Sequence, residues 1–143
     1  LVVAVAANDG YLLRNFVERG IPCLGIEPTA STAKAARELG VETLEAFFGA
    51  RFAERLAGER RKADLIAGNN VFAHVPDIND FTAGLAAALK PEGVITLEFP
   101  HVMRLVEFCQ FDTIYHSQIT MRLPQIQKLM ARVRHKIMMS FLK

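Results

Sequence analysis

Short apolar runs alternate with stretches of helical spacing from the start of the chain. Residues 1–6 form a continuous Val-rich run, typical of a strand buried on both faces of a parallel sheet. A polar turn at 8–10 ends this run, and apolar side chains then recur at helical spacing as far as Gly20, a suitable helix C-cap. A second apolar run at 23–26 ends at Glu27. The pattern predicts a strand, a helix of about ten residues and a second strand.

The same alternation continues to residue 99. It predicts strands at 41–44, 63–67 and 94–99, helices from Thr29 or Ser31 to Leu39, at 47–57 and from Asp77 to Leu89, and a turn at 90–93. Gly58 is expected to close the third helix. Asp77 is expected to cap the fourth, with Asp80 three residues on completing a capping box.

Strand and helix alternate five times, which predicts a doubly wound α/β fold with a mostly parallel, Rossmann-like sheet. Beyond residue 100 the pattern predicts helices at 101–108 and 125–134, an aromatic loop at 111–116 and a strand at 136–142. One more strand would be expected in a complete sheet of this kind, and the first residue already lies within the first strand. The chain is therefore expected to be truncated at both ends, with residues 1–143 forming a single domain.

Composition and charge limit the classes of partner. The 51% hydrophobic content of these 143 residues is enough for one core. Residues 1–118 carry 11 basic and 15 acidic side chains, whereas 119–143 carry six basic and none acidic. Because the body has no basic stripe, the basic tail is interpreted as a solvated helix face, and no nucleic-acid partner is expected. No apolar run approaches the roughly 18 residues of a membrane span, so a cytoplasmic protein without membrane contact is expected, its oligomeric state open.

Polar side chains gather where the predicted strands end, which is where a doubly wound sheet binds its ligand. The candidates are Asn8, Asp9 and Gly10 after the first strand, Glu27 after the second, Phe47 after the third, and Asn69, Asn70 and His74 after the fourth. Glu27 is the most specific of them, because a carboxylate at this position can accept both hydrogen bonds of a ribose diol. The two cysteines have no metal-ligand spacing, and no metal site is expected.

The turn after the first strand lacks the glycines of a dinucleotide-binding fingerprint. Residues 6–10 read Ala-Ala-Asn-Asp-Gly, and the chain contains no Walker A motif. A phosphate cradle is therefore not expected. Because an adenosyl ligand without phosphates needs no such cradle, S-adenosylmethionine is favoured over NAD.

Six motifs, in order along residues 1–116, are shared with a known family. They are NDGYLL at 8–13, GIEPTASTA at 25–33, FFG at 47–49, GNNVFAHVPDINDF at 68–81, LKPEGVITLEFPH at 89–101 and FDTIYH at 111–116. In these motifs the chain resembles the class I S-adenosylmethionine-dependent C-methyltransferases that act on nucleotide-linked deoxysugars. The resemblance implies the class I methyltransferase fold, S-adenosylmethionine as cofactor and a keto-deoxysugar nucleotide as the small-molecule substrate. Because such enzymes typically add an N-terminal zinc-binding lobe and a C-terminal lobe, this chain resembles their core alone.

The resemblance also implies roles for particular residues. The cofactor-binding set is Asn8, Asp9, Gly10, Glu27, Pro28, Phe47, Asn69 and Asn70, and the catalytic set is His74, Tyr115 and His116. C-methylation next to a keto group needs a base that removes a proton and a donor that stabilises the enolate. Tyr115 is the expected donor, and His74 or His116 is the expected base.

Two stretches depart from the family pattern. The family usually has an acid at the position of Ala4 and a glycine at that of Ala6, where a Cβ is expected to crowd the cofactor. The family's catalytic loop commonly reads Tyr-His-Glu-His, whereas residues 115–118 read Tyr-His-Ser-Gln, and Gln118 cannot take a proton at neutral pH. Two interpretations stay open: an active C-methyltransferase, and a catalytically degenerate adenosyl-binding module or inactive fragment.

Overall fold

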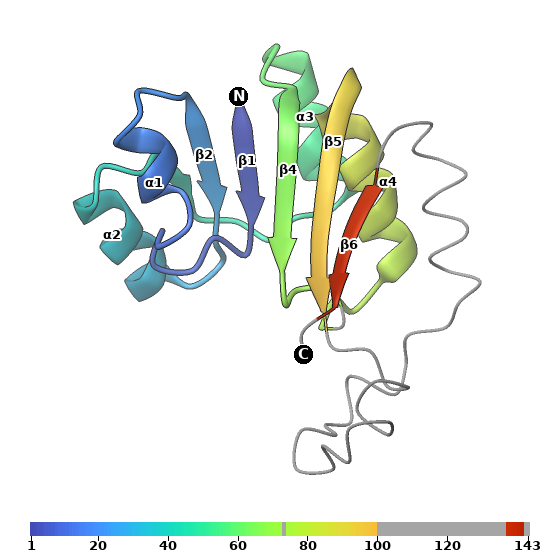
Figure 1. Cartoon of the computed structure of the whole chain (residues 1–143). Coiled ribbons are helices and arrows are strands. Elements are labelled where there is room, and N and C mark those ends of the chain that lie inside the picture. The colour runs from blue at the N-terminus through green and yellow to red at the C-terminus, as the bar shows by residue number, and fades with distance from the viewer. Residues whose placement is uncertain (73, 100–136, 142–143) are drawn as a thin grey trace.

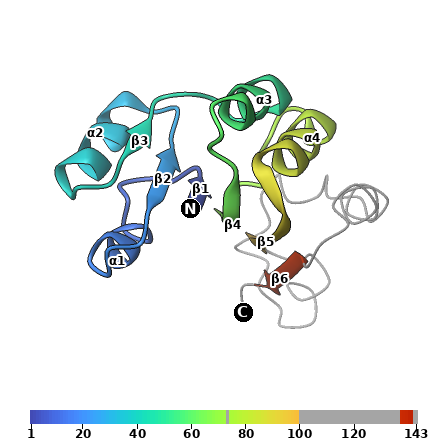
Figure 2. The same ribbon diagram turned by 90° about the horizontal axis from the view of Figure 1, so that it is seen from above.

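The computed structural model describes residues 1–72, 74–99 and 137–141 (Figure 1). The strands are β1 (Val2–Val5), β2 (Cys23–Ile26), β3 (Thr43–Leu44), β4 (Ala63–Asn69), β5 (Leu89–Phe99) and β6 (Ile137–Phe141), and the helices are α1 (Arg14–Val17), α2 (Ala30–Glu38), α3 (Ala50–Gly58) and α4 (Ile78–Ala88). The strands form one sheet in the order β3-β2-β1-β4-β5-β6, in which every neighbouring pair is parallel. Figure 2 shows α1 and α2 on one face of the sheet and α3 and α4 on the other. The predicted doubly wound α/β fold is confirmed.

Strand β1 lies at the point where the order of the chain across the sheet reverses. It pairs with β2 on one side and β4 on the other, and all four of its residues are buried. On the α3 and α4 face, Val3 and Val5 belong to a cluster that includes Phe72 and Phe81. On the α1 and α2 face, Val2 belongs to a smaller cluster of seven buried residues. The Val-rich run is thus buried on both faces, as its composition predicts.

The first helix is much shorter than predicted. Helix α1 holds four residues, and turns flank it on both sides. The side-chain amide of Asn15 donates to the carbonyl oxygens of Tyr11 at 3.0 Å and Leu12 at 3.2 Å. Side-chain bonds of this kind offer the backbone an alternative to helical pairing. Gly20 ends the segment as predicted, with a φ of 66° in the left-handed region that glycine tolerates.

Helix α3 ends at Gly58 as predicted, but the left-handed residue that closes it is an arginine two positions further on. Gly58 is the last residue of the helix, while Arg60 has a φ of 58°. The N–H of Arg60 donates to the carbonyl of Ala57 at 3.1 Å. The N–H of Arg61 donates to the carbonyl of Leu56 at 2.9 Å. This is the closing pattern of a glycine-terminated helix, but here a residue with a Cβ bears the strain.

Two aspartates at the start of α4 cap two different helices. The side chain of Asp77 caps α4 as predicted, accepting the backbone N–H groups two and three residues on at 2.8 and 3.1 Å. The predicted capping box does not close, because the carboxylate of Asp80 accepts the N–H of Ala50 at 3.2 Å and so caps α3. The two helices lie close together: a Cβ on Gly84 would be 2.8 Å from the carbonyl carbon of Gly49. Asp80 therefore joins α4 to the first turn of α3.

Strand β5 begins earlier than predicted. The predicted turn at 90–93 lies inside the strand, where the register with β4 shifts between Ala63 and Leu65. The four residues 90–93 of β5 lie opposite a single residue of β4, Asp64, so β5 bulges here.

The last described strand, β6, falls within the strand predicted at 136–142 and pairs in parallel with β5. The helices predicted at 101–108 and 125–134 and the loop predicted at 111–116 lie outside the described residues.

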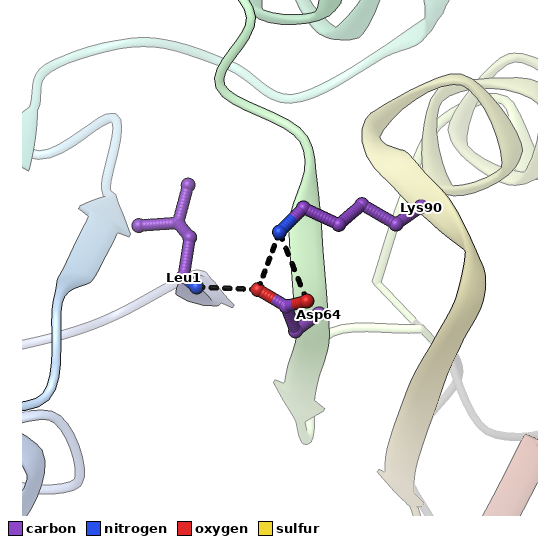
Figure 3. Close-up of polar contacts among 3 residues, drawn as sticks. All are labelled: Leu1, Asp64 and Lys90. Atoms are coloured by element: carbon purple, nitrogen blue, oxygen red, sulfur yellow. Dashed lines mark hydrogen bonds and ion pairs between the residues drawn. The ribbon is translucent and has the colours of Figure 1, made fainter.

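Asp64, near the start of β4, binds two cationic groups (Figure 3). The Nζ of Lys90 donates to both carboxylate oxygens at 2.9 and 2.8 Å, and the amino group of Leu1 donates to Oδ2 at 2.6 Å. The hydrogen bond from Lys90, and then that from the amino group, lower the pKa of Asp64 from 3.8 to about 2. Because Lys90 belongs to the bulge of β5, this ion pair ties the bulge to β4.

We expect Arg60→Gly to stabilise the fold. Glycine relieves the left-handed strain, and the free energy of unfolding should rise by about 0.5–1 kcal/mol in urea denaturation. Glu59→Gly is the matched control, since Glu59 has an ordinary φ of −77° and glycine there should lower stability. Equal changes in the free energy of unfolding at the two positions would contradict the conclusion that Arg60 is strained.

We also expect the Asp64–Lys90 pair to make stability depend on pH. Because the pKa of Asp64 is lower in the folded state, its contribution is present above about pH 4 and is lost as the pH falls toward 2. In Lys90→Met the pKa of Asp64, measured by NMR titration, should rise toward 3.8, and acid unfolding should begin at a higher pH. Lys34→Met, which removes an exposed pair with Glu38 on α2, should leave the pKa of Asp64 unchanged.

Candidate functional site

Two hollows lie beyond the carboxyl ends of the central strands, the end marked by the arrowheads of β1, β2 and β4 in Figure 1. The first, here the polar hollow, has a volume of about 470 Å³. It is lined by Ala4, Val5, Ala6, Ala7, Asn8, Tyr11, Leu12, Glu27, Thr29, Thr32, Ala67, Asn69, Asn70 and Glu98. The second, here the apolar hollow, has a volume of about 400 Å³. It is lined by Val5, Ala6, Ile26, Pro28, Ala46, Phe47, Phe48, Val71, His74, Val75, Pro76, Asp77, Asp80 and Phe81.

Val5 and Ala6 line both hollows, so the end of β1 forms the wall between them. The fold places this wall at the switch point of the sheet, where doubly wound proteins bind ligands. The two hollows thus adjoin and form one candidate site with a polar and an apolar half.

Glu27 stands at the rim of the polar hollow, directly after β2, and is only 7% exposed. Its Oε2 accepts the backbone N–H of Asn8 at 3.1 Å, and its Oε1 accepts that of Thr29 at 2.9 Å. A carboxylate offers about four lone-pair sites, so each oxygen keeps capacity for a further donor. The carboxylate is therefore fixed in place and still able to accept hydrogen bonds from a ligand.

A close approach of strands brings Glu27 to this position. A Cβ on Gly25, within β2, would lie 2.9 Å from the Cβ of Ala7 and 2.9 Å from the Oγ1 of Thr43. Only glycine fits between the turn after β1 and the neighbouring strand β3. The N–H of Ala7 donates to the carbonyl of Ile26 at 3.1 Å, which holds the turn against the end of β2.

The turn after β1 carries three residues with positive φ. Ala6 and Asn8 both have a φ of 54°, and Gly10 has a φ of 82°. Asn8 lines the polar hollow, but Asp9 and Gly10 do not. The carboxylate of Asp9 accepts the N–H of Tyr11 at 3.2 Å, while Gly10 lies against α2, where a Cβ would be 3.1 Å from that of Ala36. A role of Asp9 and Gly10 in ligand binding stays a prediction.

The opposite wall of the polar hollow comes from β4 and β5. Asn69, the last residue of β4, is paired with Glu98 of β5, and both line the hollow. The N–H of Asn70 donates to the carbonyl of Glu98 at 2.7 Å, and Asn70 has a φ of 52°. Asn69 and Asn70 thus lie where the sequence predicted them. Sequence reasoning missed Glu98, although it is the one acid in an otherwise apolar run before Pro100.

The apolar hollow holds the other predicted residues. Pro28 and Phe47 line it, and Phe47 is 83% exposed. Phe48 packs edge-to-face on Phe81, with ring centroids 5.3 Å apart. The exposed His74 lines this hollow and not the polar one, and its backbone N–H donates to the backbone carbonyl of Val71 at 2.9 Å.

The structure thus divides the predicted site residues between the two halves. Asn8, Glu27, Asn69 and Asn70 line the polar hollow, Pro28, Phe47 and His74 line the apolar hollow, Asp9 and Gly10 line neither, and Tyr115 and His116 lie outside the described residues. Tyr11, Thr29, Thr32 and Glu98 also line the polar hollow and were not predicted. Thr29 and Thr32 lie one turn apart at the start of α2, a spacing that could have identified them.

The charges around the polar hollow are of one sign. Glu27 and Glu98 are acidic, and no basic side chain lines the hollow among the described residues. In that same part of the chain, no three metal-ligating side chains come together. The site is therefore suited to a neutral or cationic organic ligand.

The longest described helix, α4, has 11 residues, and none of the helices described is long and apolar enough to cross a membrane.

Comparison with known proteins identifies the family. The sequence profile of a methyltransferase domain matches residues 3–95, which include both hollows except Glu98. The C-methyltransferase NovU of Streptomyces niveus is 37% identical over 120 residues, which are 84% of this chain and 29% of NovU. The ubiquinone biosynthesis O-methyltransferase of Pasteurella multocida is 32% identical over 107 residues, or 66% of this chain and 43% of that enzyme. The chain therefore spans less than half the length of these relatives.

Solved structures agree on the fold. The plantazolicin methyltransferase BamL, in complex with a triazolic desmethylPZN analogue and S-adenosylhomocysteine, superposes with a TM-score of 0.66 at 16% identity. The match covers 92% of this chain and 53% of BamL. At this identity the likeness concerns the fold alone, and it confirms the Rossmann-like architecture predicted from the sequence. The chain belongs to the methyltransferase domain family, and it has the class I fold.

Proposed function

We propose that this chain is the S-adenosylmethionine-binding core of a methyltransferase that adds a methyl group to carbon in a keto-deoxysugar nucleotide. The observation that carries the proposal is the position of Glu27. Its carboxylate is buried and held by two backbone N–H groups, yet it lines the rim of a polar hollow at the switch point of the sheet. An acid at this place suits the two hydroxyl groups of a ribose.

The two hollows match the two chemical halves of an adenosyl ligand. The polar hollow of about 470 Å³ offers acids and amides to the ribose and the amino-acid end. The apolar hollow offers Pro28, Phe47 and Phe48 to a flat aromatic base. When bound, S-adenosylmethionine supplies an electrophilic methyl group on a sulfonium centre. BamL, with the same fold, was crystallised with S-adenosylhomocysteine, which supports this choice of cofactor.

The negative charge of the polar hollow disfavours NAD as the ligand. A dinucleotide carries two negative phosphates, which proteins bind with helix N-termini, backbone N–H groups or basic side chains. The described lining has two carboxylates and no basic side chain, and α1, the helix after the turn, has only four residues. A cationic sulfonium is favoured by the same charges that would repel a pyrophosphate.

The relatives and the motifs support a transfer of the methyl group to carbon. NovU, a C-methyltransferase, covers more of this chain than the ubiquinone O-methyltransferases do, which supports transfer to carbon. For this chemistry we propose His74 or His116 as the base and Tyr115 as the donor to the enolate oxygen. His74 lines the apolar hollow, whose lining also includes Val5 and Ala6. A cytoplasmic location and a small-molecule acceptor are part of the proposal.

A second candidate function is an adenosyl-binding module without turnover. Ala6 supports it, because this residue has a φ of 54° and lies on the wall shared by the two hollows. Its methyl group both strains the turn and takes up space that glycine would leave to a ligand.

Calorimetric titration of the chain with S-adenosylhomocysteine tests the proposal. We expect binding with a Kd on the order of micromolar, no binding of NAD, and at least about tenfold weaker binding by Glu27→Gln. Glutamine keeps the shape of the side chain, but one of its two polar atoms can no longer accept a hydrogen bond. Glu45→Gln, at the exposed end of β3 and outside both hollows, is the control and should bind as wild type. Unchanged affinity of Glu27→Gln, or tighter binding of NAD, would refute the proposed ligand.

We expect Ala6→Gly to bind S-adenosylhomocysteine several-fold more tightly than wild type and to unfold no more easily. Glycine removes the Cβ from the wall and relieves the positive φ, which offsets the flexibility that glycine adds to the unfolded chain. Ala4→Gly, within the preceding strand β1 and outside the positive φ region, should lower the free energy of unfolding by about 0.5–1 kcal/mol without tighter binding. Weaker binding by Ala6→Gly would show that the methyl group is part of the site.

A further inference from the structure

Glu98 carries a carboxylate for which the described part of the chain supplies no partner. It lies on the wall of the polar hollow opposite Glu27, near the carboxyl end of β5. We propose that Glu98 binds the α-ammonium group at the amino-acid end of the cofactor. The proposal rests on the proposed function, because it assigns a residue to one end of the same ligand.

The backbone holds Glu98 in a fixed position. It is paired with Asn69 in the parallel ladder of β4 and β5, and its carbonyl accepts the N–H of Asn70 at 2.7 Å. The residue is half-buried. Glu98 lines the polar hollow and also a smaller hollow of about 230 Å³, whose lining includes Leu12 and Phe16. The carboxylate therefore belongs to a rigid strand and not to a mobile loop.

The two acids of the polar hollow differ in how they are satisfied. Both oxygens of Glu27 accept backbone N–H groups, at 3.1 and 2.9 Å. Among the described residues the carboxylate of Glu98 makes no hydrogen bond and no ion pair, and no basic side chain lines the hollow. Removing a carboxylate from water without a partner is unfavourable, so a half-buried acid of this kind favours a cationic ligand. Glu27 is thus suited to accept hydrogen bonds from neutral hydroxyl groups, whereas Glu98 is suited to bind a positively charged group.

The spacing of the two acids fits the two ends of one extended ligand. Glu27 follows β2 and Glu98 lies on β5, and the order β2-β1-β4-β5 separates them by three strand spacings. At about 4.8 Å per spacing this is roughly 14 Å between backbones. An adenosyl amino acid has hydroxyl groups at its ribose and an ammonium group several bonds away. The two acids are therefore arranged to bind the ribose at one end and the ammonium group at the other.

The test compares two ligands on the full 143-residue chain by calorimetric titration. One is S-adenosylhomocysteine, and the other is its desamino analogue, in which hydrogen replaces the ammonium group. We expect wild type to bind S-adenosylhomocysteine at least about tenfold more tightly than the analogue. Glu98→Gln should bind both ligands alike, with the wild-type affinity for the analogue. Glu92→Gln, an exposed acid in the bulge of the same strand, should behave as wild type.

Several outcomes would overturn the inference. Equal affinity of wild type for the two ligands would exclude an ammonium contact, and this measurement does not depend on a variant. If Glu98→Gln weakens the binding of both ligands equally, or weakens neither, Glu98 is not the partner of the ammonium group. If Glu98→Gln does not keep the wild-type circular dichroism spectrum, Glu98→Asp retains the charge on a shorter side chain and should still discriminate between the ligands, only less strongly.

The same titrations separate this inference from the proposed function. If wild type binds S-adenosylhomocysteine and Glu27→Gln weakens that binding, the proposed ligand stands. Loss of discrimination in Glu98→Gln then supports the ammonium contact, and retained discrimination refutes it alone. If wild type binds neither adenosyl ligand, the proposed function and the inference fail together.

Discussion

The carboxylate of Glu27 connects two turns that would otherwise be independent. One oxygen accepts the N–H of Asn8 in the turn after β1, and the other accepts the N–H of Thr29 in the turn before α2. Strain at Ala6 and Asn8 can persist because this double contact, together with the bond from Ala7 to Ile26, over-determines the backbone. The shape of the polar hollow therefore depends on an acid that is at once a structural link and the proposed ligand partner.

Much of this arrangement could be predicted from the order of apolar runs. Runs buried on both faces indicate parallel strands, and parallel strands place their carboxyl ends at one edge, which located Glu27, Asn69 and Asn70. Sequence could not tell which way the residues of a turn face, and Gly10 is directed to α2 and not to the hollow. Glu98 was missed because a continuous apolar run does not reveal which of its faces meets a cavity.

The ends of helices were harder to predict than their buried faces. Apolar spacing predicts which side chains face the core, but not where helical hydrogen bonds begin, and the side-chain bonds of Asn15 replace them before α1. At the end of α3 the left-handed position falls on Arg60, two residues past the glycine that composition favoured. The proposed roles of Tyr115 and His116 concern residues outside the described part of the chain.

Asp80 has a consequence for how the domain opens under thermal fluctuation. Because it sits in α4 and caps α3, neither helix can detach without exposing the first turn of the other or leaving a carboxylate without its donor. The helix pair should exchange its amide hydrogens with solvent as one cooperative unit. Asp80 of this unit, and Phe48, which packs on Phe81 of α4, also line the apolar hollow. One half of the site is thus attached to a unit that opens as a whole, while the other half is attached to the carboxyl ends of β1, β2, β4 and β5.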